Sequence, residues 1–196
     1  MSFIKSKNKD RANSSNQQLN NIYHEKQKKE LCALHTLNNL FQDNFYTKQK
    51  LDQICIELCP QEWLNPHRGL FGRGNYNINI IMKALQLRDH EAIWFDKRRS
   101  VTILNFANIK GFILNIPSDY KIAGILPLPW ERKHWVAISR IGDVYYNLDS
   151  KLDEPEIIGD ELKLTAYLDN LIKCKDKELF LVVHKDVELE SSWKLK

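Results

Sequence analysis

Cys32 stands where a protein would place a nucleophilic cysteine. It opens the segment 31–41, whose apolar residues recur at three- and four-residue spacing and predict a helix. Unpaired backbone N–H groups and the positive end of the helix dipole meet at the first turn of a helix, and both favour a thiolate. The position therefore predicts a reactive thiol, although a free cysteine is more often a small buried apolar side chain.

A nucleophilic cysteine also needs a base, and that base needs a group to orient it. His134 opens a predicted strand that returns, after a tight turn near 141–142, as a second strand ending close to Asp149. This turn sets Asp149 opposite His134, at a Cβ separation of about 5 Å. Asn147 points to the same face one step along the strand, so a register shift of two residues would make Asn147 the orienting residue.

Acyl transfer further needs hydrogen-bond donors for the developing oxyanion. Gln27 lies five residues before Cys32, so its side-chain amide is placed to donate beside the backbone N–H of Cys32. A glutamine in a lysine-rich stretch is usually just solvated, and the spacing alone leaves both interpretations open.

These residues must be brought together by helices in the first half of the chain and strands in the second. Apolar spacing, capping residues and breaks at proline or glycine predict helices over 31–41, 47–58, 77–85 and 160–174. Runs of β-branched and aromatic residues predict strands over 92–95, 111–116, 134–140, 144–148 and 178–184. This order indicates an α+β domain, with an N-terminal helical part packed on an antiparallel sheet.

Composition and charge are those of a globular protein. The chain has 196 residues, 43% hydrophobic and 28% charged, which allows one substantial core and excludes collagen-like and disulfide-stapled classes. Residues 1–30 carry seven Lys or Arg and three acidic residues, so the rest of the chain has 22 of each sign. We therefore expect no nucleic-acid partner, and at most a weak contact between the basic end and anionic membrane surfaces.

One folded domain is expected between two tails. Residues 1–20 are polar, lack a hydrophobic period and predict a disordered basic tail. The domain is expected over 21–187, followed by a short tail over 188–196 in which Trp193 is placed to dock. The sequence shows no secretory signal, no apolar run of about 18 residues and only four cysteines, so we expect reduced thiols in the cytoplasm or the nucleus.

Metal, cofactor and phosphate chemistry have little support. Cys55, Cys59 and His67 lack a fourth ligand at zinc spacing, and Cys55 fits the inner face of a helix. The glycines over 69–74 do not follow a predicted strand, as those of a phosphate loop would. They predict a loop over 60–75 beside the active-site cleft, and we expect neither a cofactor nor a metal.

Two stretches of the sequence resemble the active-site segments of Josephin-domain deubiquitinases. The first is Ile22-Tyr-His-Glu-Lys-Gln27, then Leu31-Cys-Ala-Leu-His35 and Leu37-Asn-Asn-Leu-Phe-Gln42. The second is Lys133-His-Trp135, followed by Tyr146-Asn-Leu-Asp-Ser150. Their order and spacing span about residues 21–187. They are most similar to the short branch of the family, which has little besides the Josephin domain.

The resemblance implies a papain-like cysteine peptidase fold and a peptidase that acts on ubiquitin. By matching position, it makes Cys32 the nucleophile, His134 the base, Asp149 the orienting residue and Gln27 the oxyanion donor. Asp149 is a departure, because the best-known family member has Asn there. An Asp holds an imidazolium more strongly, which favours a thiolate–imidazolium pair at rest.

Substrate contacts are suggested by the same resemblance alone. It points to Ile78, Asn79 and Trp135 as residues that touch ubiquitin. The resemblance also implies that the catalytic base lies on a strand far from Cys32 in the sequence. His35, three residues after Cys32, is therefore expected to pack within its helix. The helical arm of the family is shortened here, which leaves chain-length and linkage preference open.

We therefore expect a deubiquitinating cysteine isopeptidase that hydrolyses the bond after the C-terminal glycine of ubiquitin through a thioester. Two alternatives stay open. One is a ubiquitin-binding module with low or switched-off activity, which the pH dependence of Cys32 alkylation would distinguish. The other is an acyltransferase that applies the same Cys–His–Asp chemistry to small acyl donors, which would fail to bind ubiquitin.

Overall fold

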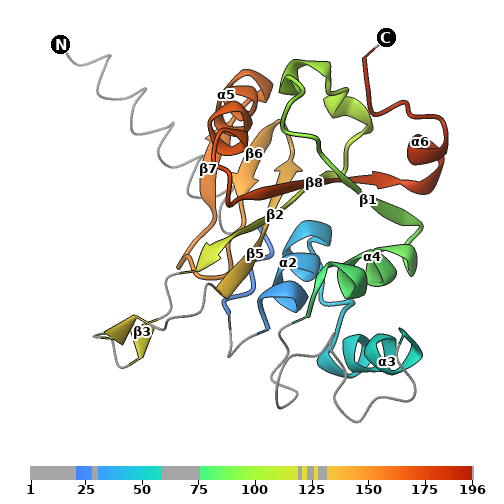
Figure 1. The fold of residues 1–196 in the computed structure, drawn as a ribbon, viewed down its shortest axis with the longest axis vertical. Coiled ribbons are helices and arrows are strands. Elements are labelled where there is room, and N and C mark those ends of the chain that lie inside the picture. Colours follow the sequence, from blue (N-terminus) through green and yellow to red (C-terminus); the bar gives the residue numbers. More distant parts are fainter. Residues whose placement is uncertain are drawn as a thin grey trace.

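The chain folds as helices packed on both faces of an antiparallel sheet (Figure 1). The computed structural model describes residues 21–27, 31–58, 76–118, 121–122, 126–127 and 132–195. The expected basic tail over 1–20 and the expected loop over 60–75 lie outside these residues.

The predicted helices are present, and a short one follows the last strand. They are α2 (Cys32–Phe41), α3 (Lys48–Leu58), α4 (Ile78–Gln86), α5 (Glu161–Ile172) and α6 (Lys185–Leu189). The side chain of Asn77 caps α4 by accepting hydrogen bonds from two first-turn N–H groups, and Asp160 caps α5 in the same manner. Among the described residues no side-chain cap is found for α2, whose N-cap residue is Leu31, and the positive end of its dipole lies at Cys32.

Six strands form one sheet in the order β1-β8-β2-β5-β6-β7, with every neighbouring pair antiparallel. The strands are β1 (His90–Trp94), β2 (Gly111–Ser118), β5 (Arg132–Ile141), β6 (Val144–Asn147), β7 (Glu156–Gly159) and β8 (Glu178–His184). The central pair β2–β5 runs from Gly111 opposite Ser139 to Ser118 opposite Arg132. Two short strands, β3 (Lys121–Ile122) and β4 (Leu126–Pro127), form a separate pair beyond its end. The sequence predicted neither this pair nor β7.

Two hydrophobic cores lie on the two faces of the sheet. One joins α2, α3 and α4 to the sheet, and the other joins α5 and the 3-10 turns η2 (Val101–Ile103) and η3 (Phe106–Asn108) to it. Trp193 is buried in the second core, as its expected docking requires. A Cβ at Gly111 would lie 2.6 Å from both Leu40 Cδ1 and Ile138 O, so only glycine lets β2 begin this close to α2.

The β5–β6 hairpin corrects the expected register. The predicted turn would set Ile138 opposite Tyr145, whereas the structure sets it opposite Asn147. The turn residues are Gly142 and Asp143, and Gly142 takes a φ of +62°. The first position of such a turn needs this left-handed backbone, which glycine adopts readily and the β-branched Ile141 does not. Every pairing therefore lies two residues further along than the sequence predicts.

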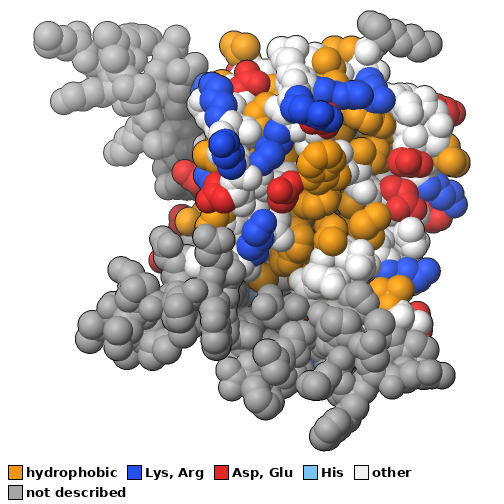
Figure 2. Space-filling model, in the orientation of Figure 1, with side chains coloured by type: hydrophobic (Ala, Val, Ile, Leu, Met, Phe, Trp, Pro, Cys, Tyr) orange, Lys and Arg blue, Asp and Glu red, His pale blue; other side chains and the backbone are white. Residues whose placement is uncertain are grey.

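Apolar and charged side chains alternate on the face of the molecule seen in Figure 2. Hydrophobic side chains gather over the β1–β8 side of the sheet, with Lys and Arg side chains along their upper border. On β1, Trp94 is largely exposed, and its indole N–H donates to Glu178 Oε2 at 2.6 Å. This exposed aromatic side chain is thus anchored at its polar end.

Candidate active site

His134 and Asp149 lie in direct contact. The Nε2 atom of His134 is 2.6 Å from Asp149 Oδ1, and the imidazole is buried. His134 lies near the start of β5, opposite Ile116 of β2, which fixes its backbone in the middle of the sheet. Nε2 donates to the carboxylate, which leaves Nδ1 as the nitrogen available for a thiol.

Asp149 reaches His134 from a turn and not from the strand. The ladder ends where the N–H of Leu148 donates to Ala137 O at 2.8 Å, and Asp149 lies beyond it. Asn147 Oδ1 accepts from the N–H of Asp149 at 3.2 Å, and the N–H of Lys151 donates to Asp149 Oδ1 at 2.9 Å. The expected contact therefore exists, although the register that predicted it was wrong.

Asn147, the alternative orienting residue, faces elsewhere. Its side-chain amide donates to Glu156 Oε2 at 2.9 Å, and its oxygen holds the backbone of Asp149. Of the two candidates, Asp149 is the one that the structure brings to His134.

Cys32 is the first residue of α2, and 5% of its surface is exposed. Its side chain is a hydrogen-bond partner of the His134 imidazole. Burial disfavours the charged ring, but the hydrogen bonds with Asp149 and Cys32 outweigh it, so the pKa of His134 is raised above its ordinary value. The helix start, the thiol and the imidazole thus converge at one point.

Asp149 is held as a carboxylate. Burial alone would raise its pKa, but the hydrogen bonds from His134 and from the backbone N–H of Lys151 lower it below the ordinary value. The Lys151 ammonium also donates to Ser118 Oγ at 2.7 Å. Lys151 therefore joins the turn that carries Asp149 to the end of β2, next to the strand that carries His134.

Gln27 lies beside the same turn. Its backbone N–H donates to Ser150 O at 2.7 Å. Ser150 directly follows Asp149, so the segment that leads to Cys32 and the turn that carries Asp149 are tied together.

Asn39 joins three parts of the site, and the sequence analysis missed it. Its side-chain oxygen accepts from the N–H of Glu25 at 2.6 Å. Its amide nitrogen donates to Glu25 O at 3.3 Å and to Leu148 O at 3.1 Å. The side chain is 0% exposed and lies on α2, the helix that carries Cys32. The adjacent amides of Asn38 and Asn39, in a helix whose residues are nearly all buried, were the signal that could have revealed it.

Glu25 is the charged member of this network. Its carboxylate accepts from His35 Nδ1 at 2.6 Å, from Asn38 Nδ2 at 3.0 Å and from the hydroxyl of Tyr23. Burial raises the pKa of Glu25, but these hydrogen bonds, chiefly that of His35, lower it below the ordinary value overall. His35 is buried in α2, as expected, and its Nδ1 bonds to Glu25.

The three residues suggested as substrate contacts lie in two settings. Ile78 and Asn79 open α4, with Ile78 half-buried and Asn79 exposed. Trp135 is buried, donates its indole N–H to Tyr76 O at 2.9 Å and packs on Phe180. Its described contacts hold the fold together, whereas Asn79 is open to a partner.

Among the described residues, no cluster of three or more His, Cys, Asp or Glu side chains has an arrangement suited to a metal ion. In the same ranges, no helix combines the length and the apolar character needed to cross a bilayer.

An antiparallel sheet with a cysteine at a helix start against a strand-borne histidine defines an α+β domain of the papain-like class. A sequence model of the family described as Josephin matches residues 27–183. The chain therefore belongs to the Josephin family, and its papain-like α+β fold agrees with the expectation from the sequence.

Individual relatives support this membership. A Josephin-like protein of Drosophila melanogaster is 48% identical over 168 residues, which cover 85% of this chain and 76% of that protein. Josephin-2 of Homo sapiens is 46% identical over 172 residues, covering 88% of this chain and 91% of that protein. Ataxin-3 of Homo sapiens is 28% identical over 160 residues, covering 72% of this chain but 40% of that protein.

Proposed function

We propose that this protein is a deubiquitinating cysteine isopeptidase, with Cys32 as nucleophile, His134 as base and Asp149 as the residue that orients the base. The observation that carries the proposal is the 2.6 Å contact between His134 and Asp149, with Cys32 as the other hydrogen-bond partner of the ring. Membership of the Josephin family supports ubiquitin as the substrate.

The reaction begins with attack of the Cys32 thiolate on the carbonyl carbon of the C-terminal glycine of ubiquitin. The oxyanion accepts hydrogen bonds from the N–H of Cys32 and from the Gln27 amide. The His134 imidazolium gives its proton to the leaving lysine amine as the C–N bond breaks, and a thioester remains. Neutral His134 then takes a proton from water, the hydroxide attacks the thioester, and ubiquitin leaves with a free carboxylate as the thiolate re-forms.

Asp149 supports both halves of this cycle. Its carboxylate fixes the ring through Nε2, so that Nδ1 faces the sulfur, and it stabilises the imidazolium that forms when the thiol loses its proton. The start of α2 favours the negative sulfur and the oxyanion at the same point.

Covalent labelling tests the assignment of Cys32. A ubiquitin vinyl sulfone probe should modify the wild type and leave Cys32→Ala unmodified, as seen by intact-mass measurement. Cys174→Ala is the matched control, because Cys174 is a partly exposed free thiol and should not affect labelling. Equal labelling of Cys32→Ala and the wild type would overturn the proposal.

Turnover tests the reaction itself. A fluorogenic ubiquitin-amide substrate, measured beside a panel of diubiquitins, should be hydrolysed by the wild type and not by Cys32→Ala. We also propose that Asn79 touches ubiquitin, so Asn79→Arg should raise KM with little change in kcat. A change confined to kcat would contradict this contact.

A second candidate function is a ubiquitin-binding module with a switched-off site. The burial of Cys32 favours it, because a cysteine residue with 5% of its surface exposed meets few substrates without movement. Binding of diubiquitin without hydrolysis, together with slow alkylation of Cys32 by iodoacetamide at all pH values, would establish this function in place of the peptidase.

A further inference from the structure

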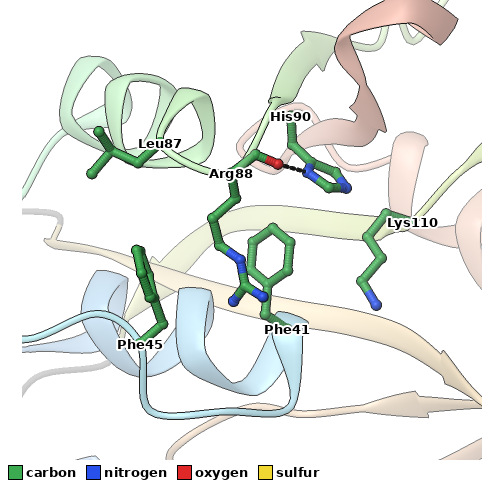
Figure 3. Close-up of a pocket in the computed structure, with 6 residues that line it drawn as sticks. All are labelled: Phe41, Phe45, Leu87, Arg88, His90 and Lys110. Atoms are coloured by element: carbon green, nitrogen blue, oxygen red, sulfur yellow. Dashed lines mark hydrogen bonds between the residues drawn. The ribbon is translucent and has the colours of Figure 1, made fainter.

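A groove lies at the C-terminal end of α2, away from Cys32 at its start. It encloses about 600 Å³ and is lined by Phe41, Phe45, Leu87, Arg88, His90 and Lys110 (Figure 3). Phe41, in its wall, lies nine residues after Cys32, about 14 Å along the helix axis. The residues of the proposed reaction therefore do not explain its composition.

Stacked cations and rings build the centre of the groove. The Arg88 guanidinium carbon lies 4.1 Å from the Phe41 ring centroid and 5.2 Å from that of Phe45, between the two rings in Figure 3. Its Nη1 also donates to Asp43 Oδ2 at 2.7 Å. Arg88 is therefore held in place by two rings and has its own counter-charge.

Lys110 is the groove cation whose ammonium forms no ion pair of its own within the described residues. Its ammonium lies 5.8 Å from the Phe41 centroid and makes no hydrogen bond or ion pair within the described part of the chain. Loss of water around the ammonium and the nearby Arg88 guanidinium lower the pKa of Lys110, and the Asp43 carboxylate, which is already paired with Arg88, offsets this only in part. A negative charge placed in the groove would relieve this repulsion.

The other polar wall of the groove adds no negative charge. The Nδ1–H of His90 donates to Arg88 O at 2.5 Å, and its ring meets that of Phe41 edge-on with centroids 5.1 Å apart. Burial lowers the pKa of His90 below its ordinary value, so the ring is neutral near pH 7. Lys50 brings a further cation to the rim, with its ammonium 3.5 Å from the Phe45 centroid.

Apolar surface stays exposed on both sides of these cations. Phe45 is 38% exposed and Leu87, which follows α4, is 52% exposed. Large exposed apolar side chains beside a cleft of this size are typical of a binding surface. A small inorganic anion would satisfy Lys110 but would leave both apolar walls in water, so the groove suits a ligand with both characters.

We propose that this groove binds an acidic segment of a partner protein in which carboxylate side chains are next to apolar ones. A carboxylate of the segment pairs with Lys110, and its apolar neighbour packs between Phe45 and Leu87. The interaction does not depend on the proposed peptidase reaction, since no residue of that reaction lines the groove.

A labelled peptide tests the proposal on the full chain. A short fluorescein-labelled peptide that alternates Glu with Leu should bind with a fluorescence anisotropy change that weakens as salt is added. The matched peptide with Gln in place of Glu should bind at least about tenfold more weakly. Equal binding of the two peptides would overturn the proposal.

Variants locate the binding. Lys110→Met and Lys110→Glu should each weaken binding of the Glu–Leu peptide, by about tenfold or more for the charge reversal, while Lys173→Glu, at the C-cap of α5, should not. Loss of peptidase activity is not expected in any of them, which separates this result from a failure of the proposed function. Unchanged binding by both Lys110 variants, or displacement of the peptide by free ubiquitin, would overturn the assignment of the groove to an acidic partner.

Discussion

The two ends of α2 satisfy their polar groups in opposite ways. At the start of the helix, the site around Cys32 has its polar groups paired, because Asp149 holds the His134 ring and is itself bonded from two sides. Glu25 and Asn39, which tie later turns of α2 to the same site, have several partners each. At the far end, Lys110 has no anionic partner among the described residues, and apolar surface is open to water. Catalytic side chains work best when the folded protein already holds them in position. A charged side chain in a binding site can instead form its ion pair with an opposite charge on the ligand. One helix thus carries a rigid site and a receptive one.

The largest effect should come from breaking the rigid end at Asp149. Asp149→Ala should lower kcat/KM by about 10²- to 10⁴-fold, because His134 loses both its orientation and its counter-charge. Asp149→Asn should retain much more activity, because an amide oxygen can still accept from Nε2. Steady-state kinetics on the ubiquitin-amide substrate measures this. Equal losses in the two variants would instead favour Asn147 as the orienting residue.

The same pair predicts a shift with pH. The hydrogen bond with Asp149 raises the pKa of His134, so the imidazolium persists to higher pH than in a free histidine. In Asp149→Asn that support is weaker, and the ring loses its proton at lower pH. The alkaline limb of the kcat/KM profile should therefore move to lower pH, and a profile identical to the wild type would contradict this role.

Asn39→Ala should cost about 3 kcal/mol of folding free energy. It leaves the N–H and C=O of Glu25 and the C=O of Leu148 without their partner inside the protein. Urea unfolding measures the loss, with the exposed Asn44→Ala as control. Activity should fall in Asn39→Ala at temperatures where the sheet is still folded. If Asn39→Ala unfolds at the urea concentration of the control, the network does not bear on stability.

Glu25→Gln tests the charge in the same network, with an expected cost of about 2 kcal/mol at pH 7. The pKa of Glu25 is lower in the folded protein than its ordinary value of 4.5, so its stabilisation is complete above that pH. It is lost as pH falls below 4.5 and the carboxylate gains a proton. Between pH 3 and pH 6, the thermal unfolding midpoint should therefore depend less steeply on pH in Glu25→Gln than in the wild type. The reason is that the variant takes up about one proton less on unfolding. Parallel curves would exclude this contribution.

The smallest effect should come from Lys110, at the groove end of α2, where the substitution should stabilise the fold and not destabilise it. Lys110→Met removes an unpaired cation that repels Arg88, so it should raise the unfolding free energy by up to about 0.5 kcal/mol. Urea unfolding at low salt measures the change, which should shrink as salt screens the repulsion. A clear loss of stability would show that Lys110 serves the fold and not a ligand.

Local patterns predicted most of the fold. Asn77 and Asp160 mark the starts of α4 and α5, because both are residue types that cap helices. Strand β8 has the bounds that its apolar run predicts. The β5–β6 register was missed because it depends on which residue takes the left-handed turn position, Gly142. Strand β7 was missed because it is short and lies at the sheet edge, where apolar alternation is weak.

The sequence alone could single out the residues proposed to react, but not the residues that support them. Cys32 and His134 stand out by residue type and by position at the start of a helix and a strand. The partners of Asn39 lie 14 and 109 residues away, so no local pattern reports them. The groove around Lys110 likewise joins the ends of α2 and α4 to the residue before β2, which only the folded chain brings together.

His134 and Asp149 meet across a boundary between two kinds of backbone. The β2–β5 ladder holds His134 opposite Ile116, within a continuous run of antiparallel pairs, where opening costs more free energy than in a turn. Asp149 lies in a turn secured by a few hydrogen bonds, and such turns open locally at much lower free energy. Opening of this turn alone would separate the dyad while the sheet stays folded. Thermal fluctuation can therefore populate a form in which the sheet is folded but His134 and Asp149 are apart.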